Sequence, residues 1–199
     1  MRRSISIALS GGILFLALLV SETSKAQKDF PEGRTVKPAL LVIDIQNAFL
    51  PYMSQDDQSW VMEIINGAIY TFRQHHLPVI KIHHSDLQWG PEPGTEAFAF
   101  PESVLTVEGE ITVIKHHPSA FQQTNLDSIL QANGCNTLYL CGLSATGCVL
   151  ATYFGAKERD YPVMMIKEGI LSQDKTYTRM INEICESVSF MTMTRMLGK

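Results

Sequence analysis

The chain has 199 residues, of which 45% are apolar and 18% are charged, and its formal net charge is −4. This length and composition predict one globular domain with a substantial core, and they argue against a disordered chain. The negative charge argues against nucleic acid and anionic membranes as partners.

The first 26 residues have the composition of a targeting segment. Arg2 and Arg3 precede an apolar stretch over residues 5–20, and Ser24 and Ala26 place small residues at positions −3 and −1 of a cleavage site. The pattern predicts a signal peptide over residues 1–26, and hence a secreted or periplasmic protein without stable membrane insertion after cleavage. An uncleaved anchor is the alternative, although the apolar run is short for a spanning helix. Cleavage would change the formal net charge from −4 to −6.

A polar segment over residues 27–37 leads into the main domain, which we expect to span residues 38–199. Residues 38–43 are a continuous apolar run that ends in Asp44. Such runs are typical of strands buried on both faces of a parallel sheet. Asp44 would then lie at the carboxyl end of a central strand, where open α/β sheets place their sites. Alternatively, Asp44 caps the turn that follows.

Strands and helices alternate along the rest of the chain. There is no internal repeat and no interdomain linker, so the pattern predicts a three-layer α/β/α sandwich with a mostly parallel, Rossmann-like sheet. A long connection rich in proline and glycine, residues 83–108, is expected to cover a site or to carry a little structure of its own. The expected helices are residues 59–75, 124–131 with Asp127 as a capping acid, and 176–185, and the expected strands are 78–82, 111–114, 137–141, 161–166 and 187–193.

Cys148 follows a strand and a tight, small-residue turn, and it begins a segment that favours a helix. Unpaired N–H groups at a helix start carry partial positive charge, so they can lower the pKa of a thiol there. The pattern therefore makes Cys148 a candidate nucleophile. The alternative is a small buried residue, which is the usual place of a free cysteine.

The chain has four cysteines: Cys135, Cys141, Cys148 and Cys185. An exported protein could join them in two disulfides. Cys141 falls in a predicted buried strand and Cys148 in the helix after it, and a domain of this size needs no covalent link. We therefore expect free thiols.

Asp44, Lys115 and Cys148 each follow the carboxyl end of a predicted strand, so a parallel sheet would bring them to one rim. A carboxylate, an ammonium and a thiol together can perform covalent acyl transfer. The acid takes the thiol proton, the thiolate attacks a carbonyl, and the ammonium favours the anionic forms.

The chain resembles the isochorismatase-like cysteine hydrolases, the superfamily that includes the nicotinamidases. The likeness runs from about residue 38 to residue 189 and includes the motifs LLVIDIQNAF (40–49), KHHPSAF (115–121) and CGLSATGCV (141–149). It implies that Asp44 is the general base, Lys115 its electrostatic partner and Cys148 the nucleophile that forms a thioester. It also implies a metal-independent branch, from the segment over residues 91–102, and a possible homo-oligomer.

The same resemblance implies an oxyanion hole made by the backbone N–H groups of Ser144 and Cys148, with a cis peptide bond between Leu143 and Ser144. The chain has Ala145 where the family usually has threonine, and Thr146 follows one position later.

Nicotinamidases hold a divalent metal with an aspartate and histidines, but residues 47–60 contain no histidine here. Three adjacent histidine pairs occur elsewhere, at residues 75–76, 83–84 and 116–117. Neighbouring residues on a strand point to opposite faces, and no carboxylate-plus-imidazole spacing completes a site. We expect no metal and no cofactor, and we regard His84 and His116 as candidates for substrate contact.

The function that these observations favour is hydrolysis of a C–N bond in a small-molecule amide, in a pocket lined by Phe49, Trp89 and Phe121. Ordinary core packing is the alternative for each ring. Two other functions stay open: an isochorismatase-type vinyl ether hydrolysis, which needs no nucleophilic thiol, and a non-catalytic binding protein that keeps the fold. A redox-sensing thiol would lack a resolving cysteine at close spacing.

Overall fold

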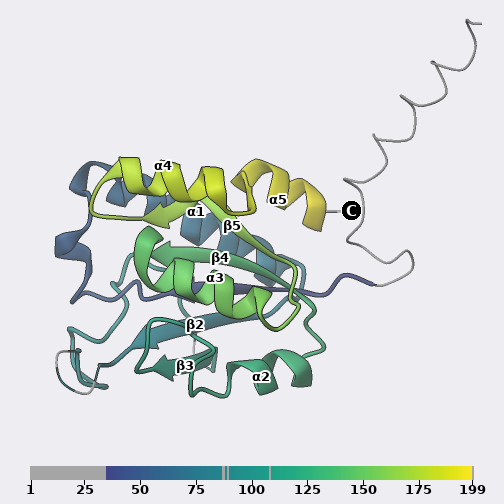
Figure 1. Ribbon diagram of the computed structural model, residues 1–199, viewed down its shortest axis with the longest axis horizontal. Helices are drawn as coiled ribbons and strands as arrows, with labels where there is room; N and C mark the ends of the chain where they lie inside the picture. Colours follow the sequence, from purple (N-terminus) through teal and green to yellow (C-terminus); the bar gives the residue numbers. More distant parts are fainter. Residues whose placement is uncertain (1–34, 87, 89, 108, 199) are drawn as a thin grey trace, which may run out of the picture. The chain divides into compact units, whose positions relative to one another are not determined.

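The computed structural model describes residues 35–86, 88, 90–107 and 109–198, so the predicted signal peptide lies outside the described residues. Six parallel strands form one sheet in the order β3-β2-β1-β4-β5-β6 (Figure 1). The predicted parallel α/β sandwich is confirmed. The strands are β1 (Pro38–Ile43), β2 (Val79–His84), β3 (Ile111–Lys115), β4 (Thr137–Leu143), β5 (Val163–Leu171) and β6 (Ser187–Val188).

Helices cover both faces of this sheet. They are α1 (Gln55–Gln74), α2 (Leu126–Ala132), α3 (Leu150–Lys157), α4 (Lys175–Ile184) and α5 (Phe190–Leu197), with the short turns η1 (Leu50–Tyr52) and η2 (Ala145–Val149). Among the described residues, none of the helices has both the length and the apolarity that crossing a membrane requires.

The alternation of side chains along β1 divides the apolar core in two. Ala39, Leu41 and Ile43 pack into the core beneath α2, α3 and α4, whereas Leu40 and Val42 pack into the core beneath α1 and α5. Every residue of β1 is buried, because both faces of a central parallel strand are covered.

The end of the chain differs from the prediction of a strand over residues 187–193. The strand stops at Val188, and α5 begins at Phe190 because the Ser189 hydroxyl accepts a hydrogen bond from the backbone N–H of Thr192. Phe190, Met193 and Leu197 then lie at helical spacing and pack on the α1 side of the sheet.

Asp127 also differs from its predicted role as a capping acid. The side chain of Asn125, the N-cap of α2, makes no capping hydrogen bond, and Thr124 Oγ1 accepts one from the N–H of Leu126 instead. Asp127 Oδ1 accepts a hydrogen bond of 2.8 Å from the hydroxyl of Tyr161. The carboxylate therefore ties α2 to the segment before β5.

Glycine is required where β4 passes β1. Gly142 has a φ of 118° and is paired with Ile43, and a Cβ atom built on it would lie 2.1 Å from the carbonyl oxygen of Ile43. No larger residue fits there without moving the backbone. This close approach brings the loop that carries Cys148 next to the end of β1, where Asp44 follows.

Candidate active site

Asp44 lies directly after β1, where the chain makes a sharp turn. Its backbone N–H donates to Ile82 O at 2.9 Å, and its carbonyl accepts from the N–H of Gln46 at 2.7 Å. The φ of Asp44 is 53°, in the left-handed region that aspartate tolerates better than most residues. Its carboxylate forms an ion pair with Lys115, so the side chain faces the rim of the sheet where Lys115 ends β3.

Lys115 is the last residue of β3, and it is fully buried. Its ammonium nitrogen lies 2.8 Å from Asp44 Oδ2, 2.9 Å from His84 Nδ1 and 3.1 Å from Cys148 Sγ. An ammonium has three N–H donors and no acceptor, so these three partners match its full capacity. Asp44, Lys115 and Cys148, which the sequence predicted to share one rim of the sheet, therefore meet at the ammonium nitrogen of Lys115.

Cys148 lies in η2, the turn that precedes α3, and it is partly buried. The peptide bond between Leu143 and Ser144 is cis, as the resemblance implied. The carbonyl of Ser144 accepts hydrogen bonds from the backbone N–H groups of Gly147 and Val149, at 3.0 and 3.3 Å. These bonds fold the loop tightly before the nucleophile candidate.

Burial shifts the pKa values of both acidic groups of the site. Burial raises the pKa of Asp44, and the nearby Lys115 opposes this effect. Burial, together with the negative charge of Asp44, raises the pKa of Cys148 to about 12. The expected lowering of the thiol pKa is therefore wrong for the substrate-free protein. Desolvation and the carboxylate outweigh the partial charge of the helix start, and Cys148 precedes α3 instead of beginning it.

The other three cysteines are free, buried thiols, as expected, and burial raises the pKa of each: Cys135, Cys141 and Cys185. Cys141 belongs to the core beneath α1, whereas Cys148 packs against the core on the opposite face. This separation argues against Cys141 as a resolving partner in a redox pair.

A pocket of about 310 Å³ opens in front of Cys148. Its wall contains both apolar and polar side chains, and no sequence pattern indicated Tyr52, Met53 or Gln173 as members of it. Gln173 follows β5, which ends at Leu171 and not at the predicted residue 166, so the sequence did not place Gln173 at a strand end. The pocket is lined by Asp44, Phe49, Tyr52, Met53, His84, Leu143, Ser144, Gly147, Cys148 and Gln173.

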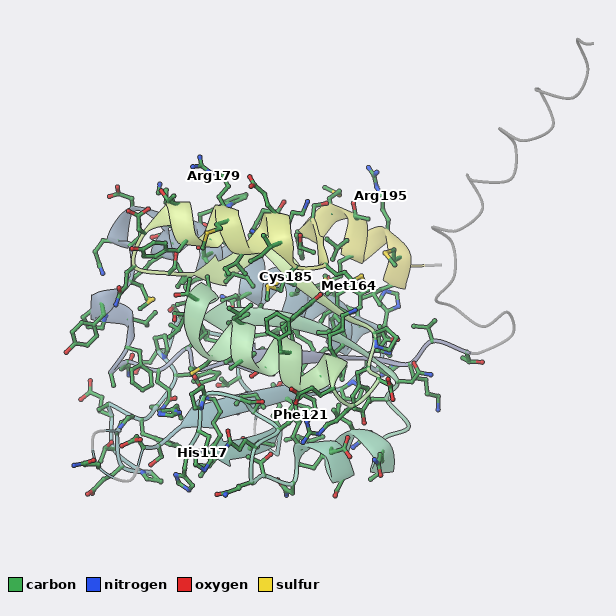
Figure 2. All side chains as sticks on the ribbon, viewed as in Figure 1. His117, Phe121, Met164, Arg179, Cys185 and Arg195 are labelled. Atoms are coloured by element: carbon green, nitrogen blue, oxygen red, sulfur yellow. The ribbon has the colours of Figure 1, made fainter. Side chains whose placement is uncertain are left out.

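The three aromatic residues assigned to this pocket have different places. Phe49 lines it, and Trp89 lies outside the described residues. Phe121 is buried beneath α3 (Figure 2), where it stacks on Tyr161 at 6.0 Å and carries the guanidinium of Arg159 at 5.0 Å. The structure therefore corrects the assignment of Phe121, whose ring belongs to the core because α2 and α3 close over it.

The two histidines that end β2 point to opposite faces. The His83 ring stacks on Phe98 at 4.8 Å and on Phe100 at 4.3 Å, whereas His84 lines the pocket. Asp44, His84 and Cys148 offer ligand atoms within 4.8 Å of one another, a spacing that could hold a metal ion. Each of these three residues, however, already contacts the ammonium of Lys115. The positive charge next to them is therefore supplied by the protein itself.

Comparisons with known proteins identify the family of this chain. Residues 38–189 match the Isochorismatase domain. The uncharacterized isochorismatase family protein YddQ of Bacillus subtilis is 31% identical over 65% of this chain and 75% of its own. Maleamate amidohydrolase of Pseudomonas putida is 33% identical over 38% of this chain and 35% of its own. The crystal structure of N-carbamoylsarcosine amidase from Thermoplasma acidophilum superposes with a TM-score of 0.68 and 27% identity, covering 78% of this chain and 97% of that one. The matched domain, the relatives and the shared fold show that this chain belongs to the isochorismatase family of hydrolases.

Proposed function

We propose that the protein is a cysteine hydrolase that cleaves the C–N bond of a small amide through a thioester on Cys148. Two of the similar proteins carry names of enzymes that act on C–N bonds, an amidohydrolase and an amidase. The catalytic roles, however, are argued from the contacts of this chain.

One observation carries the proposal. Asp44 Oδ2 binds Lys115, while Asp44 Oδ1 is buried and has no hydrogen-bond partner. An acceptor without a partner in a buried site is costly and uncommon, so such a group often has a chemical role. The Cys148 thiol is close by, with ligand atoms of the two residues within 4.8 Å. The free oxygen is therefore suited to receive the thiol proton.

The reaction follows from these positions. As Cys148 Sγ attacks the substrate carbonyl, its proton passes to Asp44, whose raised pKa makes it a stronger base than an exposed aspartate. The N–H groups of Ser144 and Cys148 would stabilise the oxyanion, each by about 10²-fold to 10³-fold in rate. Asp44 then returns the proton to the nitrogen as the C–N bond breaks. Water, deprotonated by Asp44, hydrolyses the thioester and releases the acid and the free thiol.

The test is a comparison of Cys148→Ala with the wild-type enzyme on a panel of small amides. We expect no turnover by the variant and an unchanged circular dichroism spectrum, because a small side chain at a partly buried position is removed. Mass spectrometry of the wild-type protein quenched in acid should show an acyl adduct on the peptide that contains Cys148. Near-wild-type hydrolysis by the variant would refute the mechanism.

Two further expectations belong to this proposal. Activity should be unchanged after treatment with a strong chelator. If the chelator abolished activity and a divalent ion restored it, the metal-free mechanism would be overturned.

The composition of residues 1–26 supports export to the periplasm or the medium. Amino-terminal sequencing of the exported protein should then begin at Gln27, and a chain that keeps Met1 would contradict cleavage.

A further inference from the structure

His84 is held in a fixed position at the edge of the pocket. It ends β2 and is paired in register with Lys115 at the end of β3. Gln46, which is fully buried, binds the backbone of His84 at both polar groups: its Nε2 donates to His84 O at 3.1 Å, and its Oε1 accepts from His84 N–H at 2.7 Å. A side-chain amide thus continues the pairing along β2 beyond the end of β1 and fixes the backbone from which the imidazole extends.

The contact with Lys115 determines the tautomer of His84. Lys115 Nζ lies 2.9 Å from His84 Nδ1, and an ammonium can only donate. Nδ1 must therefore be the acceptor, and the proton of a neutral imidazole lies on Nε2. Burial and the charge of Lys115 lower the pKa of His84 to about 4, with Asp86 opposing them, so the ring is neutral near pH 7.

We propose that His84 is a specificity-determining residue that donates a hydrogen bond from its Nε2–H to an oxygen acceptor on the acyl part of the substrate. His84 lines the same pocket as Cys148, and the ring of Phe49 packs edge-on at 6.0 Å and supports it. This inference rests on the proposed amide hydrolysis, and it narrows the substrate class to small amides whose acyl chain carries a carboxylate or carbonyl oxygen.

The other walls of the pocket agree with such a substrate. Phe49, Met53 and Leu143 provide apolar surface for a short acyl chain. A site that places a buried donor against a substrate oxygen discriminates against the analogue without that oxygen, because the donor is then left without a partner. The preference should therefore be measurable as the ratio of kcat/KM for two amides that differ only in whether the acyl chain carries this oxygen-bearing group.

The test uses maleamate and cis-crotonamide, which has a methyl group where maleamate has its carboxylate. The two variants are His84→Asn, whose side-chain oxygen can replace Nδ1 toward Lys115, and His84→Gln, whose amide can replace the Nε2–H donor. We expect wild type to prefer maleamate in kcat/KM, and His84→Asn to reduce that preference by roughly tenfold to a hundredfold. His84→Gln should keep most of it. If the ratio of the two kcat/KM values is unchanged in His84→Asn, even when both values fall by the same factor, the proposal is overturned.

Two measurements do not depend on turnover, so a failure of the hydrolytic mechanism is distinguishable from a failure of this inference. In Cys148→Ala protein, binding of the two amides followed by NMR should favour maleamate, and adding His84→Asn should remove the difference. The ¹⁵N shifts of the His84 ring should show a protonated Nε2 and an unprotonated Nδ1 at pH 7. The opposite tautomer, an imidazolium, or equal binding of the two amides would contradict the assignment.

Discussion

Two lysine–aspartate pairs in this protein have nearly the same length and opposite surroundings. Lys115 and Asp44 lie 2.8 Å apart with side chains that are 0% and 2% exposed. Lys175 and Asp57 lie 2.7 Å apart with side chains that are 62% and 28% exposed. Water and salt weaken the second pair, whereas the first is enclosed by the ends of three strands. The distance between two charges therefore says little about their role, and their burial says much.

Burial also makes the first pair costly to interrupt. A charge removed from water is stable only while its partner and hydrogen bonds remain. Asp44 and Lys115 come from β1 and β3, which are separated by β2, so the sheet itself holds them in register. This rigidity allows a carboxylate oxygen without a partner to persist beside the thiol.

The largest effect is expected for Asp44→Asn. The amide oxygen can still accept from Lys115, but it cannot take a proton from the thiol, so kcat should fall by about 10² to 10⁴. In the wild-type enzyme, the rate should fall in acid as Asp44 becomes protonated, at a higher pH than for an ordinary aspartate, because its pKa is raised. Steady-state kinetics over a range of pH measure both effects. A loss of less than tenfold would move the base role to another residue, and His116 would be tested next.

The same variant should change the acidity of the nucleophile in the opposite direction to its activity. The charge of Asp44 is one of the causes that raise the pKa of Cys148 to about 12, and Lys115 lowers that pKa. Asp44→Asn should therefore have a more acidic thiol and a much slower reaction. A titration of thiolate absorbance at 240 nm, with the double variant Asp44→Asn, Cys148→Ala as the blank, measures this pKa. A thiol pKa that stays or rises would show that the carboxylate does not act on the sulfur.

Lys115→Met comes next. The substitution leaves the carboxylate of Asp44 buried without its cation, and breaking a buried pair in this way costs about 3–5 kcal/mol of unfolding free energy. Denaturant unfolding measures the loss. The control is Lys115→Met combined with Asp44→Asn, which removes the lone charge and should recover part of that stability without restoring activity. A single variant as stable as wild type would mean that the pair is more solvated than its burial indicates.

The strand-end argument explains how much of the site could be predicted from sequence. Asp44, Lys115 and Cys148 were found because each follows a buried strand, and parallel strands share one rim. His84, which the sequence made a candidate for substrate contact, also ends a strand. Gln173 lies at the same rim only because β5 continues to Leu171, five residues beyond its predicted end at residue 166. Gln46 was missed because a side chain that binds only backbone leaves no periodic signal.

The parts of the prediction that the structure corrects depend on contacts between distant segments. The sequence of residues 187–193 predicts a strand because the segment is short and largely apolar. In the structure, Phe190, Met193 and Leu197 instead pack at helical spacing on the α1 side of the sheet. Phe121 is the last residue of the motif that begins with Lys115, yet α3 closes over its ring. The raised pKa of Cys148 results from burial and from Asp44, which lies 104 positions away in the chain.

A smaller effect on stability is expected for Gly142→Ala, which changes no charged group. The new Cβ would meet the carbonyl of Ile43 at a φ of 118°, so the ends of β1 and β4 must move apart, at a cost of about 1–3 kcal/mol. Asp44 and Cys148 would separate with them, and kcat should fall while KM changes less. Unfolding and kinetics measure the two effects, and Gly94→Ala, at a positive φ with open space around it, is the matched control for backbone strain alone. Equal behaviour of the two variants would contradict the positioning role of Gly142.

The smallest effect is expected for Lys175→Met, the counterpart of Lys115→Met at the exposed pair. Asp57 keeps its hydrogen bond from Ser54 Oγ, and water replaces the ammonium, so neither charge becomes buried and unpaired. The midpoint of denaturation should stay within experimental error of wild type at 150 mM salt, and kcat and KM should not change, because the pair lies outside the pocket of Cys148. The measurement is decisive when both lysine variants are unfolded side by side at low and high salt. If Lys175→Met destabilised the protein as much as Lys115→Met, burial would not be what separates the two pairs, and the argument that assigns a chemical role to the buried one would lose its basis.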